Sequence, residues 1–288
     1  MADERREAAG DVGPGRGGHT RVLLTHPAGG TAELYAHGGQ LLTWRHPHHG
    51  DVLFLSRRDD RRQESHGGVP VVFPRFGKDP EGRLRQHGFA RDLEWAIGER
   101  GQQGDGRTTA SMTLRATPET LAQWPHDFRL EIEVALGEAL TMTLRATNPG
   151  PDPFVFTAAL HSYLRVAELR RVRIRGLGGV AYRESAGTAR EGVDPEPLVI
   201  EAATDRTYRE CPSPIVVADA ARTLVVENRG WRNVVVWNPG PTGDERYDFA
   251  HGEWARFVCV ESATVLEPIT LAAGESWSAS QTLSVRAG

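Results

Sequence analysis

Side chains able to bind an oxygen-rich ligand gather between residues 66 and 95, in the stretch HGGVPVVFPRFGKDPEGRLRQHGFARDLEW. Gly67-Gly68 allows a turn free of Cβ clashes, and the VPVVFP run after it is extended because proline fixes φ and lacks an N–H. A polar loop rich in arginine follows, and the planar arginine fork suits vicinal oxygens, carboxylates or phosphates. We expect Gly77 and Gly88 to let this loop approach a ligand closely. The stretch therefore predicts a loop system that builds a binding site.

Some charges in this loop are assigned to solvent and others to the site. The polar residues are Arg75, Lys78, Arg83, Arg85, Gln86, His87 and Arg91. We interpret Arg83 and Arg85 as solvated, because charged side chains are mostly exposed without a specific role. Gln86, His87 and Arg91 share the run QHGFAR, where glutamine and histidine add directional hydrogen bonds to the arginine fork. These three residues are the predicted ligand-binding group of the loop.

A histidine and a glutamate further along the chain are candidates for acid–base chemistry. His161 follows the apolar run FVFTAAL, and a single histidine at a strand end is more often a hydrogen-bonded structural residue. Alternation over residues 256–262 puts Phe257, Cys259 and Glu261 on one strand face. A carboxylate in so apolar a strand is costly to bury unless something pairs with it. Glu261 is therefore a candidate general base, with a salt-bridged structural role as the alternative, and Cys259 is interpreted as packing.

Several motifs together resemble one family. The segments GGVPVVFPRFG and QHGFAR are similar to those of the glucose-6-phosphate 1-epimerases, or hexose-6-phosphate mutarotases, of the galactose-mutarotase-like β-sandwich superfamily. Three later stretches fit the same family in the same order: LHSYLRV around His161, TDRTY around Asp205, and VVVWNPG followed by RFVCVE ending at Glu261. The match spans residues 21–285, and separated motifs in order are more specific than any one of them.

The resemblance implies acid–base interconversion of sugar anomers. A base removes the proton of the anomeric hydroxyl, and an acid protonates the ring oxygen, so that the ring opens to the free aldehyde. Rotation about the C1–C2 bond exposes the other carbonyl face, and the same groups in reversed roles close the ring. By resemblance, Glu261 is the base and His161 the acid, and each supplies roughly 10²- to 10⁴-fold. No cofactor is implied, because only protons move.

The resemblance also implies a set of substrate ligands. Asp205 in TDRTY resembles a residue that binds sugar hydroxyls, and Gln86, His87 and Arg91 match the family's binding loop. Asp248, in the stretch ERYDFAHGEWARFVCVE, is a further candidate for the same cleft, with a solvated loop carboxylate as the alternative.

The residue before Gly67-Gly68 departs from the family. That position is typically an arginine that contacts the sugar phosphate, and here it is His66. A phosphate monoester carries about −1.5 to −2 charge, so its site usually needs more than one donor. Histidine is only partly protonated near neutrality and lacks the arginine fork, so Arg75 is a candidate for the missing charge beside Arg91. A hexose 6-phosphate is the expected substrate, and an unphosphorylated or differently charged aldose is the competing one.

Two other classes of function fit some of the same residues. Asp205, Asp248 and Glu261 are also a possible set of glycosidase carboxylates, because such enzymes flank the scissile bond with two acids. A mutarotase pairs one carboxylate with a histidine instead. A carbohydrate-binding module without turnover is the other alternative, and His161 together with Glu261 favours catalysis over it.

Composition predicts one water-soluble domain. Of 288 residues, 39% are hydrophobic and 25% charged, which gives material for a core, and the net charge of −4 gives no reason to expect nucleic-acid or membrane binding. Cys211 and Cys259 lie far apart in the sequence, so we expect neither a disulfide framework nor a zinc site. We expect the protein in a reducing compartment. Residues 1–20 are predicted to be a flexible tail without a signal sequence, and residues 21–288 a single domain. We expect a cytoplasmic monomer without metal or cofactor.

Period-2 alternation predicts an all-β fold, a large antiparallel β-sandwich. The clearest pattern is the hairpin Phe128–Ala146, with its turn at Gly137-Glu138 and one face on a core. Residues 118–124 are the one predicted short helix. The histidine-rich run at residues 46–49 suggests metal binding, but a solvent-exposed turn between strands explains it more simply.

Overall fold

The hairpin predicted over Phe128–Ala146 is present in the computed structural model, which describes residues 10–59, 66–220, 222–247 and 249–288. β9 (Arg129–Leu136) pairs antiparallel with β10 (Leu140–Thr147), and Leu136 lies opposite Leu140. Buried apolar residues alternate with polar ones along both strands, as the sequence pattern predicts. The predicted helix is α1 (Pro118–Gln123), which begins where the Thr117 side chain accepts the Thr120 N–H at 3.3 Å.

Three sheets with antiparallel ladders contain the described strands. The first sheet runs β1 (Asp11–Pro14), β2 (Thr20–Thr25), β3 (Thr31–Tyr35), β4 (Gln40–His46) and β5 (Gly50–Asp51). The second runs β13 (Arg173–Arg175), β17 (Ile215–Ala218), β18 (Arg222–Arg229), β21 (Ser276–Ala287), β10, β9, β8 (Thr108–Arg115) and β7 (Ala96–Gln102). The third runs β15 (Arg190–Val193), β14 (Ala181–Glu184), β16 (Thr204–Tyr208), β19 (Asn233–Asn238), β20 (Phe257–Leu271), β11 (Phe154–Leu160) and β6 (Val71–Val72). β12 (Tyr163–Arg165) also pairs with β20. Besides α1, the helices are α2 (Gly243–Arg246) and the 3-10 turns η1 (Arg16–Gly18), η2 (Ala90–Asp92), η3 (Leu169–Arg171) and η4 (Glu253–Arg256).

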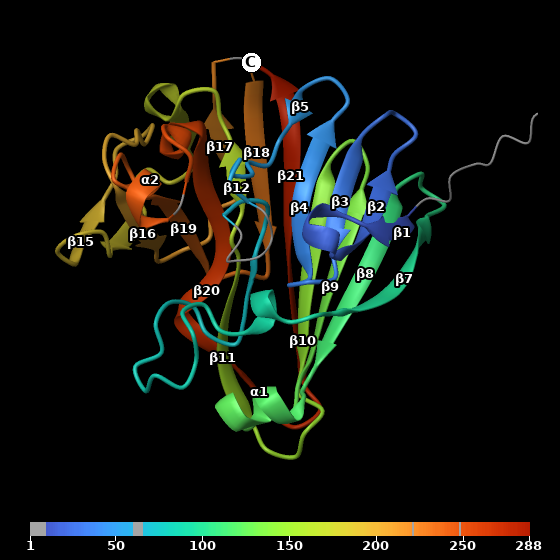
Figure 1. The fold of residues 1–288 in the computed structure, drawn as a ribbon. Coiled ribbons are helices and arrows are strands. Elements are labelled where there is room, and N and C mark those ends of the chain that lie inside the picture. The colour runs from blue at the N-terminus through green and yellow to red at the C-terminus, as the bar shows by residue number, and fades with distance from the viewer. Residues whose placement is uncertain (1–9, 60–65, 221, 248) are drawn as a thin grey trace, which may run out of the picture.

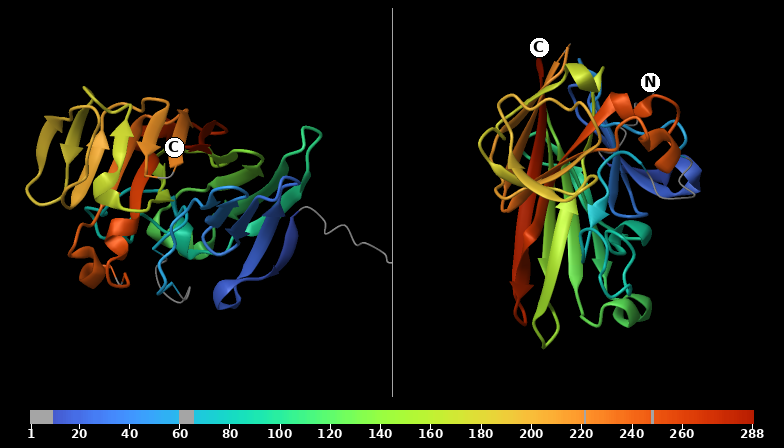
Figure 2. Two further views of the ribbon diagram at one scale, coloured as in Figure 1. Left: turned by 90° about the horizontal axis from the view of Figure 1, so that it is seen from above. Right: turned by 90° about the vertical axis from the view of Figure 1, so that its left-hand side faces the viewer.

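The second and third sheets enclose the main hydrophobic core. Met112, Leu144 and Leu283 of the second sheet belong to the same buried cluster as Phe156 and Val260 of the third. In Figure 1 the blue first sheet lies against β8 and β9, which β2 and β3 contact. Figure 2, seen from above, places β14–β16 and the first sheet at opposite ends of the molecule. The arrangement confirms the predicted antiparallel β-sandwich.

The predicted flexible tail over residues 1–20 is wrong from residue 11 onward. β1 pairs along β2, with Asp11 opposite Leu23 and Pro14 opposite Thr20. Its side chains are mostly exposed, so the sequence carries no apolar alternation there, and backbone hydrogen bonds to the edge of β2 order the segment instead. Across the described parts of the chain, no helix is both long enough and apolar enough to span a membrane.

Candidate active site

His161 and Glu261 meet because their two strands pair. β11 ends at Leu160, which lies opposite Ser262 of β20, so the next residue of one strand faces the preceding residue of the other. Nε2 of His161 lies 3.5 Å from Oε1 of Glu261. The two residues are only 8% and 1% exposed. The antiparallel ladder therefore brings the predicted acid and base into one buried pair.

The predicted facing of β20 is confirmed. Val260 packs in the main core, whereas Phe257 and Cys259 belong to a second cluster on the other face. That second cluster consists of Phe54, Tyr163, Phe249, Phe257 and Cys259, with Trp237 and Tyr247 packed against it. Burial raises the pKa of the Cys259 thiol, with the Glu261 charge adding to the effect, which agrees with a packing role. Glu261 is thus on the face of the third sheet that points away from the main core.

Aromatic rings fix the His161 imidazole. It stacks on Tyr163 at 4.8 Å between ring centroids and 11° between planes, while Trp237 meets it edge-on at 5.8 Å. The backbone N–H of His161 donates to the Pro70 carbonyl at 3.0 Å, which ties it to the predicted extended run. Sequence reasoning did not name Tyr163 or Trp237 as site residues, although both lie in motifs that it quotes.

Two buried polar atoms of the pair are unsatisfied. Nδ1 of His161 and Oε2 of Glu261 have no hydrogen-bond partner among the described residues. A buried polar atom without a partner costs roughly 1–3 kcal/mol, so such atoms mark positions where a ligand's hydroxyl groups can bind. The pair therefore leaves two buried polar atoms available for hydrogen bonds.

Burial disfavours charge on both members of the pair. Burial raises the pKa of Glu261 well above its usual range, and the nearby Asp205 charge adds to it. Burial lowers the pKa of His161, and the neighbouring His87 and Arg91 lower it further. Although the 3.5 Å separation is that of an ion pair, these directions favour a protonated carboxyl beside a neutral imidazole. The two groups therefore hold one transferable proton between them.

Asp205 joins the same face from β16. It lies opposite Trp237 of β19, which lies opposite Cys259 of β20, and residues directly opposite in a sheet share a face. Burial raises the pKa of Asp205 to about 6, with the Glu184 charge as a second cause. Asp248, the other predicted acidic ligand, lies outside the described residues.

The predicted binding loop reaches the pair through His87. Its ring meets the His161 ring edge-on at 5.8 Å, and its Nδ1 accepts the Gly77 N–H at 3.3 Å. Burial lowers the pKa of His87 to about 3, and the Arg91 charge is the second cause, so the ring is neutral. Arg91 donates to the Gln86 carbonyl at 2.8 Å, which orients its guanidinium. The structure thus brings His87 to the His161 ring and Arg91 close enough for its charge to act on His161.

Glycine at position 88 lets two segments of the chain approach each other closely. Its φ is +74°, and a Cβ there would collide with the carbonyl of Phe73. Gly77 also has a positive φ, of +75°, and no protein atom lies within 4 Å of the position of a Cβ there. The close contact at Gly88 joins the apolar run and the loop that follows it, and the approach of a ligand to Gly77 and Gly88 stays a prediction.

His66 and Arg75 have different surroundings. The His66 ring packs edge-on against Phe249 at 5.0 Å, and its charge contributes to the lowered pKa of His161, so it borders the site. Arg75 donates from Nε to the Lys78 carbonyl at 3.3 Å and lies 3.7 Å from Asp79. It lines a separate cavity beside α1, so the structure does not bring it to the His161–Glu261 pair.

The two arginines interpreted as solvated are exposed. The Arg83 side chain pairs with Glu81, and Arg85 lies 3.0 Å from Asp92. Their side chains are 58% and 63% exposed, in agreement with that interpretation.

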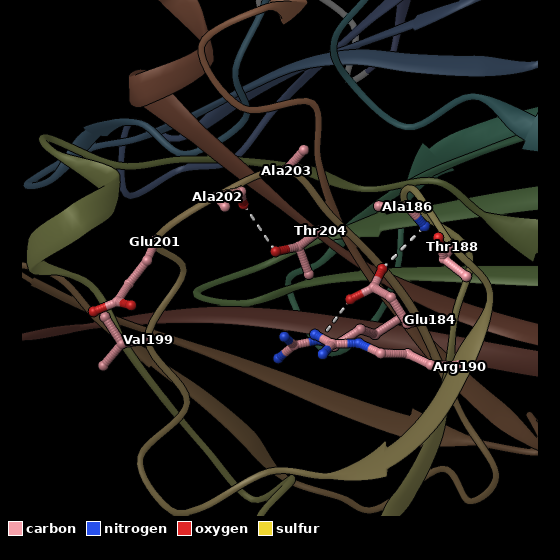
Figure 3. A pocket seen from close by; sticks show the side chains of 10 residues that line it. Glu184, Ala186, Thr188, Arg190, Val199, Glu201, Ala202, Ala203 and Thr204 are labelled. Atoms are coloured by element: carbon pink, nitrogen blue, oxygen red, sulfur yellow. Dashed lines mark hydrogen bonds and ion pairs between the residues drawn. The ribbon is translucent and has the colours of Figure 1, made fainter.

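A cavity of about 410 Å³ borders β14 and β16 (Figure 3). Its lining includes Glu184, Thr204 and Arg206. Thr204 and Arg206 flank Asp205 in β16, and successive strand side chains point to opposite faces. The cavity is therefore on the far side of the sheet from His161 and Glu261.

The fold is that of the galactose mutarotase-like proteins. A galactose mutarotase-like protein from Clostridium acetobutylicum superposes with a TM-score of 0.79 at 15% identity, over 99% of this chain and 100% of that chain, which shows the shared fold. Residues 20–284 match the family model described as aldose 1-epimerase. The chain belongs to the aldose 1-epimerase family, whose activity is an isomerase activity.

Relatives over most of the chain carry a more specific name. A protein from Cenchrus ciliaris, provisionally named glucose-6-phosphate 1-epimerase, is 33% identical over 279 residues, covering 90% of this chain and 83% of its own. A Salmonella typhimurium protein with the same provisional name is 32% identical over 253 residues, covering 86% and 84%. A crystal structure provisionally described as the mutarotase YeaD from Salmonella typhimurium superposes with a TM-score of 0.86 at 30% identity, covering 94% of this chain and 91% of that chain.

Proposed function

We propose that this protein interconverts the α and β anomers of an aldohexose 6-phosphate, with glucose 6-phosphate as the substrate. The observation that carries the proposal is the buried His161–Glu261 pair, with one unsatisfied polar atom on each side chain, next to the Arg91 loop. Relatives provisionally named glucose-6-phosphate 1-epimerase support the substrate. A cytoplasmic location and a monomeric state stay predictions from the sequence.

The proton inventory of the pair fits ring opening. Glu261 as a carboxylate takes the proton of the anomeric hydroxyl, while the imidazolium of His161 gives a proton to the ring oxygen. The neutral pair favoured by burial holds the same single proton, so transfer from the Glu261 carboxyl to His161 converts one form into the other. Ring closure on the other aldehyde face runs these transfers in reverse, and the pair returns to its starting state.

A bound phosphate group gives a reason for that transfer. The Arg91 charge is one cause of the lowered His161 pKa. A phosphate paired with Arg91 neutralises that charge, so the His161 pKa rises toward its usual range and the imidazole becomes a better base for the Glu261 proton. Substrate binding and activation of the acid are then linked through one arginine.

Two-dimensional exchange NMR of the anomeric protons tests the function. We expect wild-type protein to speed anomer exchange of glucose 6-phosphate well above the buffer rate, with kcat/KM at least about tenfold higher than for glucose. Equal kcat/KM values for the two sugars would remove the phosphate from the proposal and leave an aldose 1-epimerase. Exchange at the buffer rate for both sugars would leave a binding protein without turnover.

A further inference from the structure

Glu184 is a buried carboxylate with both oxygens engaged. It ends β14, is 3% exposed, and borders the cavity in Figure 3. Oε1 accepts the backbone N–H of Asp205 at 2.7 Å and of Ala186 at 3.1 Å, and Oε2 accepts Nε of Arg206 at 2.9 Å. Arg206 in turn donates to Asp194 at 2.8 Å. The carboxylate cannot turn without breaking several charge-assisted hydrogen bonds, so its position is fixed.

The bond to Asp205 replaces a backbone hydrogen bond. The ladder between β14 and β16 ends with Glu184 opposite Arg206. Beyond it, the N–H of Ser185 donates to the Asp205 carbonyl at 2.8 Å. The N–H and C=O of one strand residue point to the same side, so the Asp205 N–H also faces β14. There the Asp205 N–H donates to the Glu184 carboxylate. This bond extends the pairing of β14 with β16 by one residue, at the point where the Asp205 side chain faces the site.

We propose that Glu184 is a positioning residue for substrate binding, because its carboxylate fixes the backbone of Asp205 and so aims the Asp205 side chain at the hydroxyl groups of a bound sugar. The inference rests on the proposed function. Glu184 lies on the far side of the sheet from the reacting atoms. It therefore acts on the substrate only through Asp205, beside the His161–Glu261 pair.

The charge of Glu184 also acts on Asp205. Carboxylates lie on three strands of the third sheet: Glu184 on β14, Asp205 on the neighbouring β16, and Glu261 on β20, which β19 separates from β16. Burial is the main cause of the raised pKa of Asp205, and the Glu184 charge is the second cause. Burial is likewise the main cause of the raised pKa of Glu261, and the Asp205 charge is the second. Arg206 is bonded to Glu184 and Asp194 on the other face. A change of charge at Glu184 therefore reaches Asp205 first.

A double-mutant cycle separates positioning from a general effect on the fold. The variants are Glu184→Gln, Asp205→Asn and the double variant, each measured for KM and kcat of anomer exchange. We expect Glu184→Gln to raise KM about tenfold with a smaller change in kcat, and to have almost no effect when Asp205 is already asparagine. Glu201→Gln is the matched control, because Glu201 is an exposed carboxylate that borders the same cavity. Equal effects of Glu184→Gln in both backgrounds would overturn the proposal.

The pH profile gives a readout that a merely structural role does not move. The wild-type kcat/KM should fall as Asp205 is protonated near its pKa of about 6. Glu184→Gln removes a negative charge beside Asp205, so this acidic limb should shift to lower pH, whereas a limb that stays in place contradicts the electrostatic coupling. Glu184→Asp keeps the charge and the Arg206 pair but shortens the reach, so it should raise KM without moving the limb. It also keeps the test available if the glutamine variant does not fold.

The amide signal of Asp205 tests the same contact without turnover. Its proton resonance should move upfield in Glu184→Gln and stay in place in Glu201→Gln, because a charged acceptor binds an N–H more strongly than a neutral amide does. An unchanged Asp205 resonance refutes the positioning bond even in a protein that turns over no sugar. An upfield shift in a protein without anomer exchange keeps the positioning bond and rejects the proposed function.

Discussion

Nε2 of His161 lies 3.5 Å from Oε1 of Glu261, a separation longer than a normal hydrogen bond between these atoms. Each side chain also keeps one buried polar atom without a partner among the described residues. If the two side chains formed all their hydrogen bonds with each other, no polar atom of the pair would be available to a ligand. The geometry instead leaves donors and acceptors available to the anomeric hydroxyl and the ring oxygen of a sugar.

Replacing either member of the pair should remove catalysis. Glu261→Gln and His161→Ala should each lower the exchange rate by about 10²- to 10⁴-fold at saturating substrate. Glu261→Gln should fold at least as stably as wild type, because burial makes the charged carboxylate costly. NMR anomer exchange and thermal denaturation measure the two effects, with the exposed Glu267→Gln as control. A near wild-type rate for either variant would refute the assigned roles.

Most of the fold could be predicted because its central strands alternate. The hairpin of β9 and β10 buries every second residue, and that pattern is written in the sequence. β7, β14 and β15 were not predicted, because they carry charged or glycine residues without regular alternation. In β14 and β16, the charges of Glu184 and Arg206 pair with each other. Local pattern cannot reveal a strand held by a side-chain network.

The candidate site was predictable by motif and not by geometry. His161 and Glu261 are far apart in sequence, and only the register of Leu160 opposite Ser262 shows that they meet. The sequence predicts Arg91 in the binding motif and Arg75 as a candidate for the missing charge, and only the structure shows that Arg91 acts on His161 whereas Arg75 pairs with Asp79. Arginines in one loop have the same local sequence signal, and their directions depend on tertiary contacts.

Arg91 should select for the phosphorylated sugar. Arg91→Ala should raise KM for glucose 6-phosphate by about tenfold or more, with a much smaller change for glucose, because a charge-assisted bond to phosphate is lost. Arg83→Ala is the matched control, since the exposed Arg83 pairs with Glu81 outside the His161 surroundings. Steady-state exchange kinetics with both sugars check this. Equal losses for glucose and its phosphate would show that Arg91 acts on the fold of the loop.

His66→Arg should strengthen selection for phosphate. The His66 charge already reaches His161, and arginine carries its charge at every working pH. We expect His66→Arg to lower KM for glucose 6-phosphate with little change for glucose. His66→Gln should raise KM for glucose 6-phosphate and leave KM for glucose unchanged. Competition binding with inorganic phosphate checks the same point. An unchanged phosphate affinity in both variants would mean that this position does not contact the phosphate.

His87 should make the protein sensitive to acid. Its folded pKa of about 3 lies below the usual 6.5, so the unfolded chain binds a proton first as the pH falls, and stability is lost between about pH 6.5 and 3. His87→Asn cannot titrate, and asparagine tolerates the φ of +69° at this position. The variant should therefore lose less stability than wild type between pH 7 and pH 5 in denaturant titrations. Parallel losses in the two proteins would contradict a buried neutral imidazole.

Asp205 should reduce the free energy of unfolding at neutral pH, because its carboxylate is then ionised in buried surroundings. Its folded pKa is raised from 3.8 to about 6, so the folded state holds the proton more tightly than the unfolded state does. Stability is greatest below about pH 4 on this account and falls as the pH rises through 6, where the carboxylate ionises in its buried surroundings. Asp205→Asn removes that cost, so the variant should be more stable than wild type by on the order of 1–3 kcal/mol at pH 7.5, with almost no difference at pH 4. Urea denaturation at both pH values measures this, and the exposed Asp127→Asn should show no such pH-dependent gain. A variant less stable than wild type at pH 7.5 would mean that the ionised side chain is held by favourable bonds and is not destabilised by burial.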